Sequence, residues 1–164
     1  MALQQKLLGL IGGTSPASTE IYYRLLNENA RRRLGEAHSA RLVLWSFDFD
    51  LIDKAYKAAD WDRYRLLVVE AAETLKRAGV DALMICSNTT HLGAESAKAA
   101  TGLPLIHVID ALAGAVKSQG SRNPLMLGTP FVMAGDFYRA DLRARLGVET
   151  AAPNEDEQSE ICRI

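Results

Sequence analysis

Two hydrophobic periods alternate along this chain. Short, almost continuously apolar runs of strand length occur at residues 6–11, 41–46, 82–86, 105–108 and 124–127. Runs of this kind are typical of strands that are covered on both faces. Segments with a helical period fill the gaps between them, and this order predicts an α/β fold with a parallel sheet flanked by helices.

The clearest helical segment lies between Asp60 and Ala78, where apolar residues recur at alternating spacings of three and four. Gly79 follows and is expected to end this helix in a left-handed conformation. An earlier helix is expected to be capped by Ser18 or Thr19 and to end before Gly35.

A polar, turn-forming stretch at residues 118–124 predicts a boundary between two lobes. We expect residues 1–117 to form a first α/β lobe that carries Cys86. Residues 118–164 are expected to begin a second α/β lobe that is incomplete, with a strand at 124–127, a helix at 132–146 and another helix capped by Asn154.

Composition narrows the functional classes. The 164 residues carry 19 Lys and Arg against 20 Asp and Glu, a net charge of −1 that gives no bulk attraction to nucleic acid or to an anionic membrane. The first apolar run is too short for a membrane span and lacks the cleavage pattern of a signal peptide. We therefore expect a cytoplasmic protein that binds neither nucleic acid nor membrane, with reduced cysteines.

The segment from Cys86 to His91 carries the most chemical information. It follows an apolar strand, and in a parallel sheet the carboxyl end of a strand faces the ligand crevice. The N–H groups of a following helix would stabilise a Cys86 thiolate, while Asn88 and Thr89 would offer an amide and a hydroxyl to a carboxylate. The alternative is a buried cysteine with a structural role only.

Other polar groups follow the predicted strands. The loop at Gly13 and Thr14 has the composition of a phosphate cradle but lacks the ending of a P-loop and the spacing of a dinucleotide motif. Asp48 ends the second predicted strand and is a candidate contact for a substrate ammonium. His91 is expected either to lie near the site or to contact the residues that form it. One Cys with one nearby His does not predict a metal site.

Several motifs occur together in a fixed order. They are Gly9-Leu10-Ile11-Gly12-Gly13-Thr14-Ser15, Ser18-Thr19, Tyr22-Tyr23-Arg24, Asn27, Cys86-Ser87-Asn88-Thr89-Thr90-His91, Leu127-Gly128-Thr129 and Asp136-Phe137-Tyr138. In this combination the chain resembles the aspartate/glutamate racemase superfamily, in its branch of aspartate racemases and broad-specificity amino-acid racemases.

The resemblance implies two α/β lobes facing a cleft, no pyridoxal phosphate or other cofactor, and one cysteine from each lobe beside the α-carbon of the substrate. Cys86 matches the first-lobe cysteine. The second is expected in a Gly-Cys-Thr-Glu motif that these residues lack, and Cys162 does not match it. Members of the superfamily commonly form homodimers, so we expect one here.

Two departures from the family pattern concern substrate choice. The Gly-Gly turn continues as Thr14-Ser15-Pro16-Ala17 in place of Met-Ser-Trp-Glu, which makes Ser15 a secondary candidate for side-chain recognition. The segment Ser46-Phe47-Asp48-Phe49 also lacks the arginine of the dedicated aspartate racemases. We expect an amino-acid substrate, and the resemblance implies a dicarboxylic one. The sequence does not identify which amino acid is preferred.

Racemisation removes the α-proton on one face and returns a proton on the other, so it needs two acid/base groups. We expect Cys86 to be one of them. The substrate carboxylate is expected against Gly13, Thr14, Asn88, Thr89 and Thr129, where donors stabilise the carbanionic intermediate. The alternative function is a non-catalytic amino-acid-binding or regulatory module derived from the first lobe.

Overall fold

A computed structural model describes residues 5–147 and 149–163. The chain divides into two compact units, the first ending at Ile106 and the second beginning at His107. This division precedes the helix at Val108–Ser118, whereas the sequence places the boundary after it. The helix joins the second unit because its buried residues, Ile109 and Ala113, belong to the apolar core of that unit.

The first unit contains a parallel sheet in the order β2-β1-β3-β4. Its strands are β1 (Leu8–Gly12), β2 (Leu42–Ser46), β3 (Ala82–Ile85) and β4 (Leu105–Ile106). They overlap the first four predicted apolar runs, which confirms the predicted α/β class, but β1 begins two residues later than predicted and β4 is only two residues long, because His107 caps α5. In the register, Ile11 of β1 pairs with both Trp45 of β2 and Ile85 of β3.

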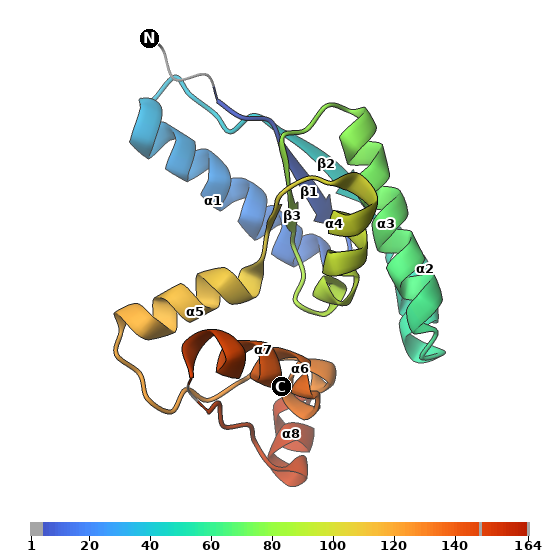
Figure 1. The fold of residues 1–164 in the computed structure, drawn as a ribbon, viewed down its shortest axis with the longest axis vertical. Helices are drawn as coiled ribbons and strands as arrows, with labels where there is room; N and C mark the ends of the chain where they lie inside the picture. The colour runs from blue at the N-terminus through green and yellow to red at the C-terminus, as the bar shows by residue number, and fades with distance from the viewer. Residues whose placement is uncertain (1–4, 148, 164) are drawn as a thin grey trace. The chain divides into compact units, whose positions relative to one another are not determined.

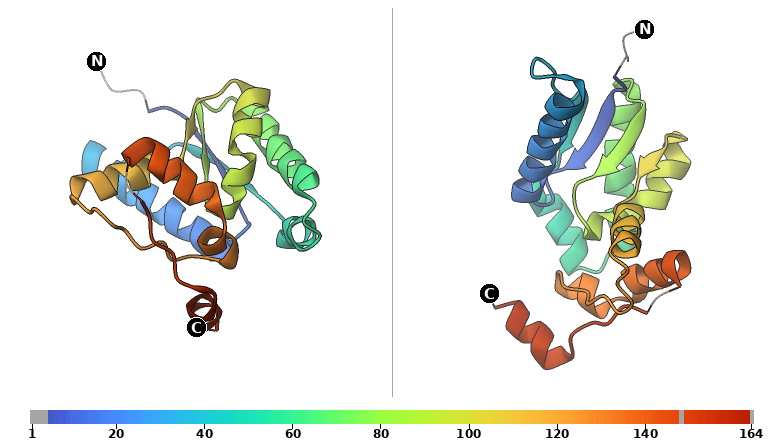
Figure 2. Two further views of the ribbon diagram at one scale, coloured as in Figure 1. Left: turned by 60° about the horizontal axis from the view of Figure 1, so that its bottom comes forward. Right: turned by 90° about the vertical axis from the view of Figure 1, so that its left-hand side faces the viewer.

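Helices cover both faces of this sheet, as Figures 1 and 2 show: α1 (blue) lies on one face, and α3 and α4 (green to yellow-green) lie on the other. The helices of the first unit are α1 (Pro16–Leu34), α2 (Phe49–Lys57), α3 (Trp61–Arg77) and α4 (Ala94–Thr101), with the 3₁₀ helix η1 at Thr89–Gly93. The face toward α3 holds the larger core, which includes Ile11, Tyr64, Val68, Leu75, Leu83 and Ile85.

Local signals set the ends of these helices. The α3 helix has the predicted bounds, since the Asp60 carboxylate accepts a bond from the Arg63 N–H and Gly79 takes a φ of 80°. The predicted cap of α1 is wrong. Ser15 is the cap in place of Ser18 or Thr19, because Pro16 fits the first helical position and the Ser15 hydroxyl accepts the Ser18 N–H at 3.3 Å.

The second unit, orange to red in Figure 1, is helical over most of its described length. Its helices are α5 (Val108–Ser118), α6 (Pro130–Ala134), α7 (Asp136–Leu146) and α8 (Glu155–Ile161). The start of α8 is as predicted: Asn154 and Glu157 form a reciprocal capping box. The core of this unit is formed by Ile109, Ala113, Met126, Val132, Tyr138 and Leu142.

Two predicted elements of this unit are wrong. The run at 124–127 forms one isolated parallel bridge, between Leu125 and Ala151, because the described residues supply no longer strand to pair with it. The helix predicted at 132–146 is split into α6 and α7 because Gly135 adopts an extended backbone, with φ −80° and ψ 145°. Within the described ranges, no helix combines the length and the apolar character needed to cross a membrane.

Candidate functional site

Two neighbouring strands of the first unit deliver the candidate site. Because β1 and β3 are adjacent and parallel, the loop at Gly13 and Thr14 and the segment after Ile85 leave the sheet at the same edge. Gly13 has a φ of 86°, and a Cβ atom there would lie 2.3 Å from the backbone N of Phe47. The chain at this turn is therefore closely packed, and only glycine fits.

Cys86 lies immediately after β3 and is held through its backbone. Its N–H donates to the Ile11 carbonyl at 2.9 Å, and its own carbonyl accepts the Ser18 hydroxyl of α1 at 2.8 Å. The side chain is fully buried. These contacts fix the backbone of Cys86 between β1 and the first turn of α1.

The ionisation state of Cys86 differs from the prediction. Burial raises the pKa of the thiol to about 12, so the sulfur is protonated at neutral pH. The expected helix N-terminus is not adjacent: the 3₁₀ helix η1 begins at Thr89, and the regular helix α4 begins only at Ala94. Desolvation therefore outweighs the expected stabilisation of a thiolate.

The phenol of Tyr22 belongs to the same environment. Tyr22 is half-buried on α1, and its pKa is raised first by burial and second by the negative charge that Cys86 would carry as a thiolate. Tyr22 is thus a neutral hydroxyl at neutral pH, and its ionisation is coupled electrostatically to that of Cys86.

The Gly13–Thr14 loop differs from its predicted role in one respect. The N–H of Gly13 donates to the Thr19 hydroxyl at 3.1 Å, so this predicted substrate donor is already occupied within the protein. The Thr14 hydroxyl instead accepts from Thr90 at 3.2 Å, and Thr90 in turn lies 3.1 Å from the Tyr64 hydroxyl. Thr14, which is half-buried, is the group of this loop whose side chain is directed into a polar network.

The residues after Cys86 form η1. Asn88 is exposed at the start of this turn, and Thr89 is half-buried in its first position. His91 is buried, with its Nδ1 atom 2.8 Å from the Ser87 carbonyl. Because a carbonyl only accepts, Nδ1 carries the proton in this bond. His91 thus braces the turn that carries Asn88 and Thr89.

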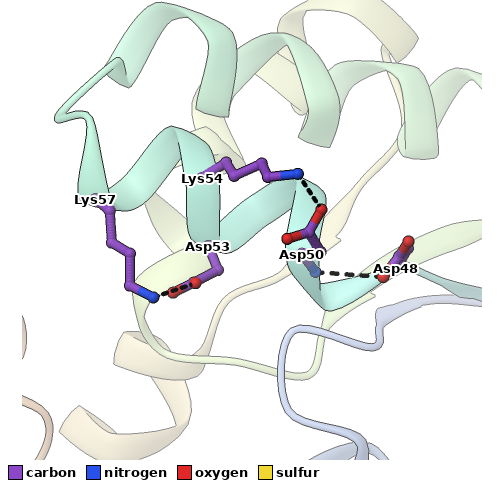
Figure 3. Close-up of polar contacts among 5 residues, drawn as sticks. All are labelled: Asp48, Asp50, Asp53, Lys54 and Lys57. Atoms are coloured by element: carbon purple, nitrogen blue, oxygen red, sulfur yellow. Dashed lines mark hydrogen bonds and ion pairs between the residues drawn. The ribbon is translucent and has the colours of Figure 1, made fainter.

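The two secondary candidates Ser15 and Asp48 both cap helices. Ser15 caps α1 as described above. The Asp48 carboxylate accepts the Asp50 N–H at 3.3 Å at the start of α2, where Figure 3 shows it beside the helix. Two further acidic residues of that helix form ion pairs one turn away, Asp50 with Lys54 and Asp53 with Lys57.

The remaining predicted residues belong to the second unit. Thr129 is exposed at the start of α6, where its carbonyl accepts the N–H groups of Val132 and Met133. Cys162 is exposed at the end of α8. The site of the first unit is built without either of them. In the part of the chain that is described, no three His, Cys, Asp or Glu side chains are grouped to hold a metal ion.

Sequence reasoning missed the functional potential of Ser18, Thr90 and Tyr64. Ser18 was predicted as a helix cap, but it binds the carbonyl of Cys86. Tyr64 gave no signal of its own, because its position in the apolar period of α3 marks it as a core residue. The run of hydroxyl residues after Cys86 was the one available indication for Thr90.

Comparison with known proteins identifies the family of this chain. The family model for Asp/Glu/hydantoin racemases matches residues 11–164, and the chain belongs to that family. Among curated proteins it is 19% identical over 140 residues to the broad-specificity amino-acid racemase RacX of Bacillus subtilis (strain 168). That match covers 84% of this chain and 60% of RacX, so the chain spans about 60% of the length of this relative.

Solved structures share the fold. A candidate Asp/Glu racemase from Yersinia pestis has a TM-score of 0.91 at 40% identity, and an aspartate racemase homologue from Pyrococcus horikoshii OT3 has 0.86 at 32%. Both matches cover 98% of this chain and 70% of the other. The aspartate racemase of Picrophilus torridus has a TM-score of 0.74 at 22% identity, and the match covers 94% of this chain and 65% of the racemase chain. At this identity the match shows the fold alone.

Proposed function

We propose that this chain supplies one acid/base face of a cofactor-independent amino-acid racemase, with the Cys86 sulfur carrying the proton that moves at the α-carbon. The observation that carries the proposal is the position of Cys86 directly after β3, bonded through its backbone to β1 and to Ser18 of α1. Membership of the racemase family and the racemase relatives support the reaction class.

The buried thiol suits the acid half of the reaction. A thiol with a pKa of about 12 holds its proton at neutral pH and can return it to a carbanion on the face that it contacts. The reverse direction needs a Cys86 thiolate. An amino-acid substrate brings an ammonium group, and a positive charge within a few ångströms lowers the pKa of a thiol.

Complete racemisation needs a second group on the opposite face. The sequence holds one other cysteine, Cys162, which is exposed at the end of α8 in the second unit. We do not assign it that role, since it lacks the sequence context of the family's second cysteine. The chain is thus proposed to exchange the α-proton of one enantiomer with solvent faster than it inverts configuration.

The substrate carboxylate is proposed to bind the edge formed by Thr14, Asn88 and Thr89. Thr14 offers a hydroxyl whose oxygen accepts a hydrogen bond from Thr90, and Asn88 is exposed at the same end of the sheet. Donors that are fixed before substrate binds stabilise the charge of the α-carbanion, and the loss of one typically costs ~10²-fold in rate. Dicarboxylic amino acids are the first substrates to test.

The test is α-proton exchange in deuterated water. L- and D-amino acids, beginning with aspartate and glutamate, are incubated with the unaltered protein, and loss of the Cα–H signal is followed by NMR. We expect Cys86→Ala to abolish exchange and Cys162→Ser to leave it unchanged. Exchange that survives Cys86→Ala would refute the assignment of the sulfur as the proton carrier.

The high pKa of Cys86 specifically favours a second candidate function, a non-catalytic amino-acid-binding module. A thiol that is almost never ionised is a weak base in the absence of ligand. Calorimetry separates the two functions: this alternative predicts that aspartate or glutamate binds equally to the unaltered protein and to Cys86→Ala, with no α-proton exchange by either.

A further inference from the structure

Three hydroxyl groups from distant parts of the first unit form a chain that ends at the candidate site. Tyr64 of α3 lies 3.1 Å from Thr90 of η1, and Thr90 donates to Thr14 of the β1–α1 loop at 3.2 Å. Tyr64 is 2% exposed and Thr90 is 0% exposed, whereas Thr14 is half-buried. This series of hydrogen bonds thus runs from the core to the more exposed loop after β1.

The direction of the hydrogen bonds follows from the number of protons that each hydroxyl carries. A hydroxyl has one proton, so Thr90, which donates to Thr14, must accept from Tyr64. Among the described residues, Thr90 is the one hydrogen-bond partner of the Tyr64 hydroxyl. Burial raises the pKa of the Tyr64 phenol, so this proton is present at neutral pH. The order is therefore Tyr64 to Thr90 to Thr14.

This order determines what Thr14 presents. The Thr14 oxygen already accepts the Thr90 proton. Its own proton therefore remains free for an acceptor other than these three hydroxyl groups. A carboxylate oxygen is an acceptor only, and hydrogen bonds to a charged acceptor are about twice as strong as neutral ones. The carbonyl of an uncharged amide is a weaker acceptor for the same Thr14 proton.

We propose that Tyr64, through Thr90, is a positioning residue that holds the Thr14 hydroxyl as a hydrogen-bond donor for a substrate carboxylate. This inference rests on the proposed function for the identity of the ligand as an amino acid. Tyr64 does not touch the ligand. Its contribution is to favour a carboxylate over an uncharged group of the same shape at Thr14.

The test compares dissociation constants of L-aspartate with those of its two monoamides, L-asparagine and L-aspartic acid α-amide, measured by calorimetry on the full chain. In the unaltered protein, one of the two amides should bind more weakly than aspartate, which identifies the carboxylate that the site prefers. In Tyr64→Phe that preference should fall by about 2- to 10-fold, the range of one hydrogen bond. A ratio is used because a loss of folded protein affects all three ligands equally.

Two threonine variants distinguish a relay from a general structural effect. Thr90→Ser keeps the hydroxyl and should retain the preference for aspartate over its amide. Thr90→Val should reduce that preference as Tyr64→Phe does. Thr101→Val is the control, because Thr101 is also buried but its hydroxyl donates to the Ala97 carbonyl of its own helix and accepts the Leu103 N–H. It should leave the preference unchanged.

Groups in series are not additive. The double variant Tyr64→Phe/Thr90→Val should therefore retain the same preference as Thr90→Val alone. An unchanged preference in Tyr64→Phe, multiplying effects in the double variant, or failure of the unaltered protein to distinguish aspartate from either amide would overturn the inference. Binding without α-proton exchange would instead count against the proposed function and leave the relay standing.

Discussion

The raised pKa of Cys86 makes the stability of the folded protein depend on pH in a way that one variant can isolate. In the unfolded chain the thiol has its ordinary pKa of 9.0, and in the folded protein burial raises it to about 12. The folded state therefore keeps its proton where the unfolded state loses it. The stabilisation is fully present below pH 9 and is lost as the pH rises toward 12.

The magnitude follows from the free energy of one pKa unit, about 1.36 kcal/mol. At pH 10 the unfolded thiol is ionised and the folded thiol is not, which lowers the free energy of unfolding by roughly 1 kcal/mol relative to pH 7. At pH 11 the loss grows to roughly 3 kcal/mol. Tyrosine and lysine side chains also titrate in this range, so the absolute pH profile alone does not identify the sulfur.

The assay is urea unfolding at pH 7 and pH 10 in a Cys162→Ser background, with and without Cys86→Ala. The background removes the exposed thiol and prevents disulfide-linked dimers. The protein with Cys86 should lose roughly 1 kcal/mol more than the alanine variant between these pH values. Equal losses in both proteins would refute the burial of the thiol and the pKa that follows from it.

Three further predictions concern the same sheet edge, and a fourth concerns Gly114 in α5 of the second unit. For α-proton exchange, kcat/KM reports the free protein, so it should rise about tenfold per pH unit between pH 6.5 and 8.5; a plateau near pH 7 would contradict a high-pKa sulfur as the base. Gly13→Ala should destabilise the protein by at least ~2 kcal/mol through its clash with Phe47 and its positive φ. Gly114→Ala, in a helix with open space around the new Cβ atom, should stabilise by about 0.5–1 kcal/mol in the same denaturant titration. Asp48→Ala should cost ~1 kcal/mol as a lost helix cap and leave the dissociation constant of aspartate unchanged in calorimetry, whereas a large loss of affinity would make Asp48 a substrate ligand.

The sequence identified the elements of the first unit because their signals are local. The apolar runs that became β1 to β4 are bounded by turn residues, and Gly79 and Asp60 mark the ends of α3. The second unit was harder to predict. An apolar run becomes a strand only when another strand pairs with it, and the run at 124–127 has one bridging partner, Ala151, among the described residues.

The candidate site was predicted in its location but not in its electrostatics. The position of Cys86 after a strand follows from the apolar run before it. Its burial depends on the surrounding packing, and whether η1 or a regular helix follows it is decided by tertiary structure. The Tyr64–Thr90–Thr14 chain joins three segments far apart in sequence, so no local pattern could show it.

The stereochemical course of α-deuterium incorporation tests the central claim most directly. One enantiomer of aspartate or glutamate is incubated with the Cys162→Ser protein in deuterated water, and the deuterated product is resolved by chiral chromatography. If Cys86 is the proton carrier on one face, deuterium enters with retained configuration, for one enantiomer only, and Cys86→Ala abolishes it. Inversion as fast as exchange, or exchange that persists in Cys86→Ala, would contradict the account.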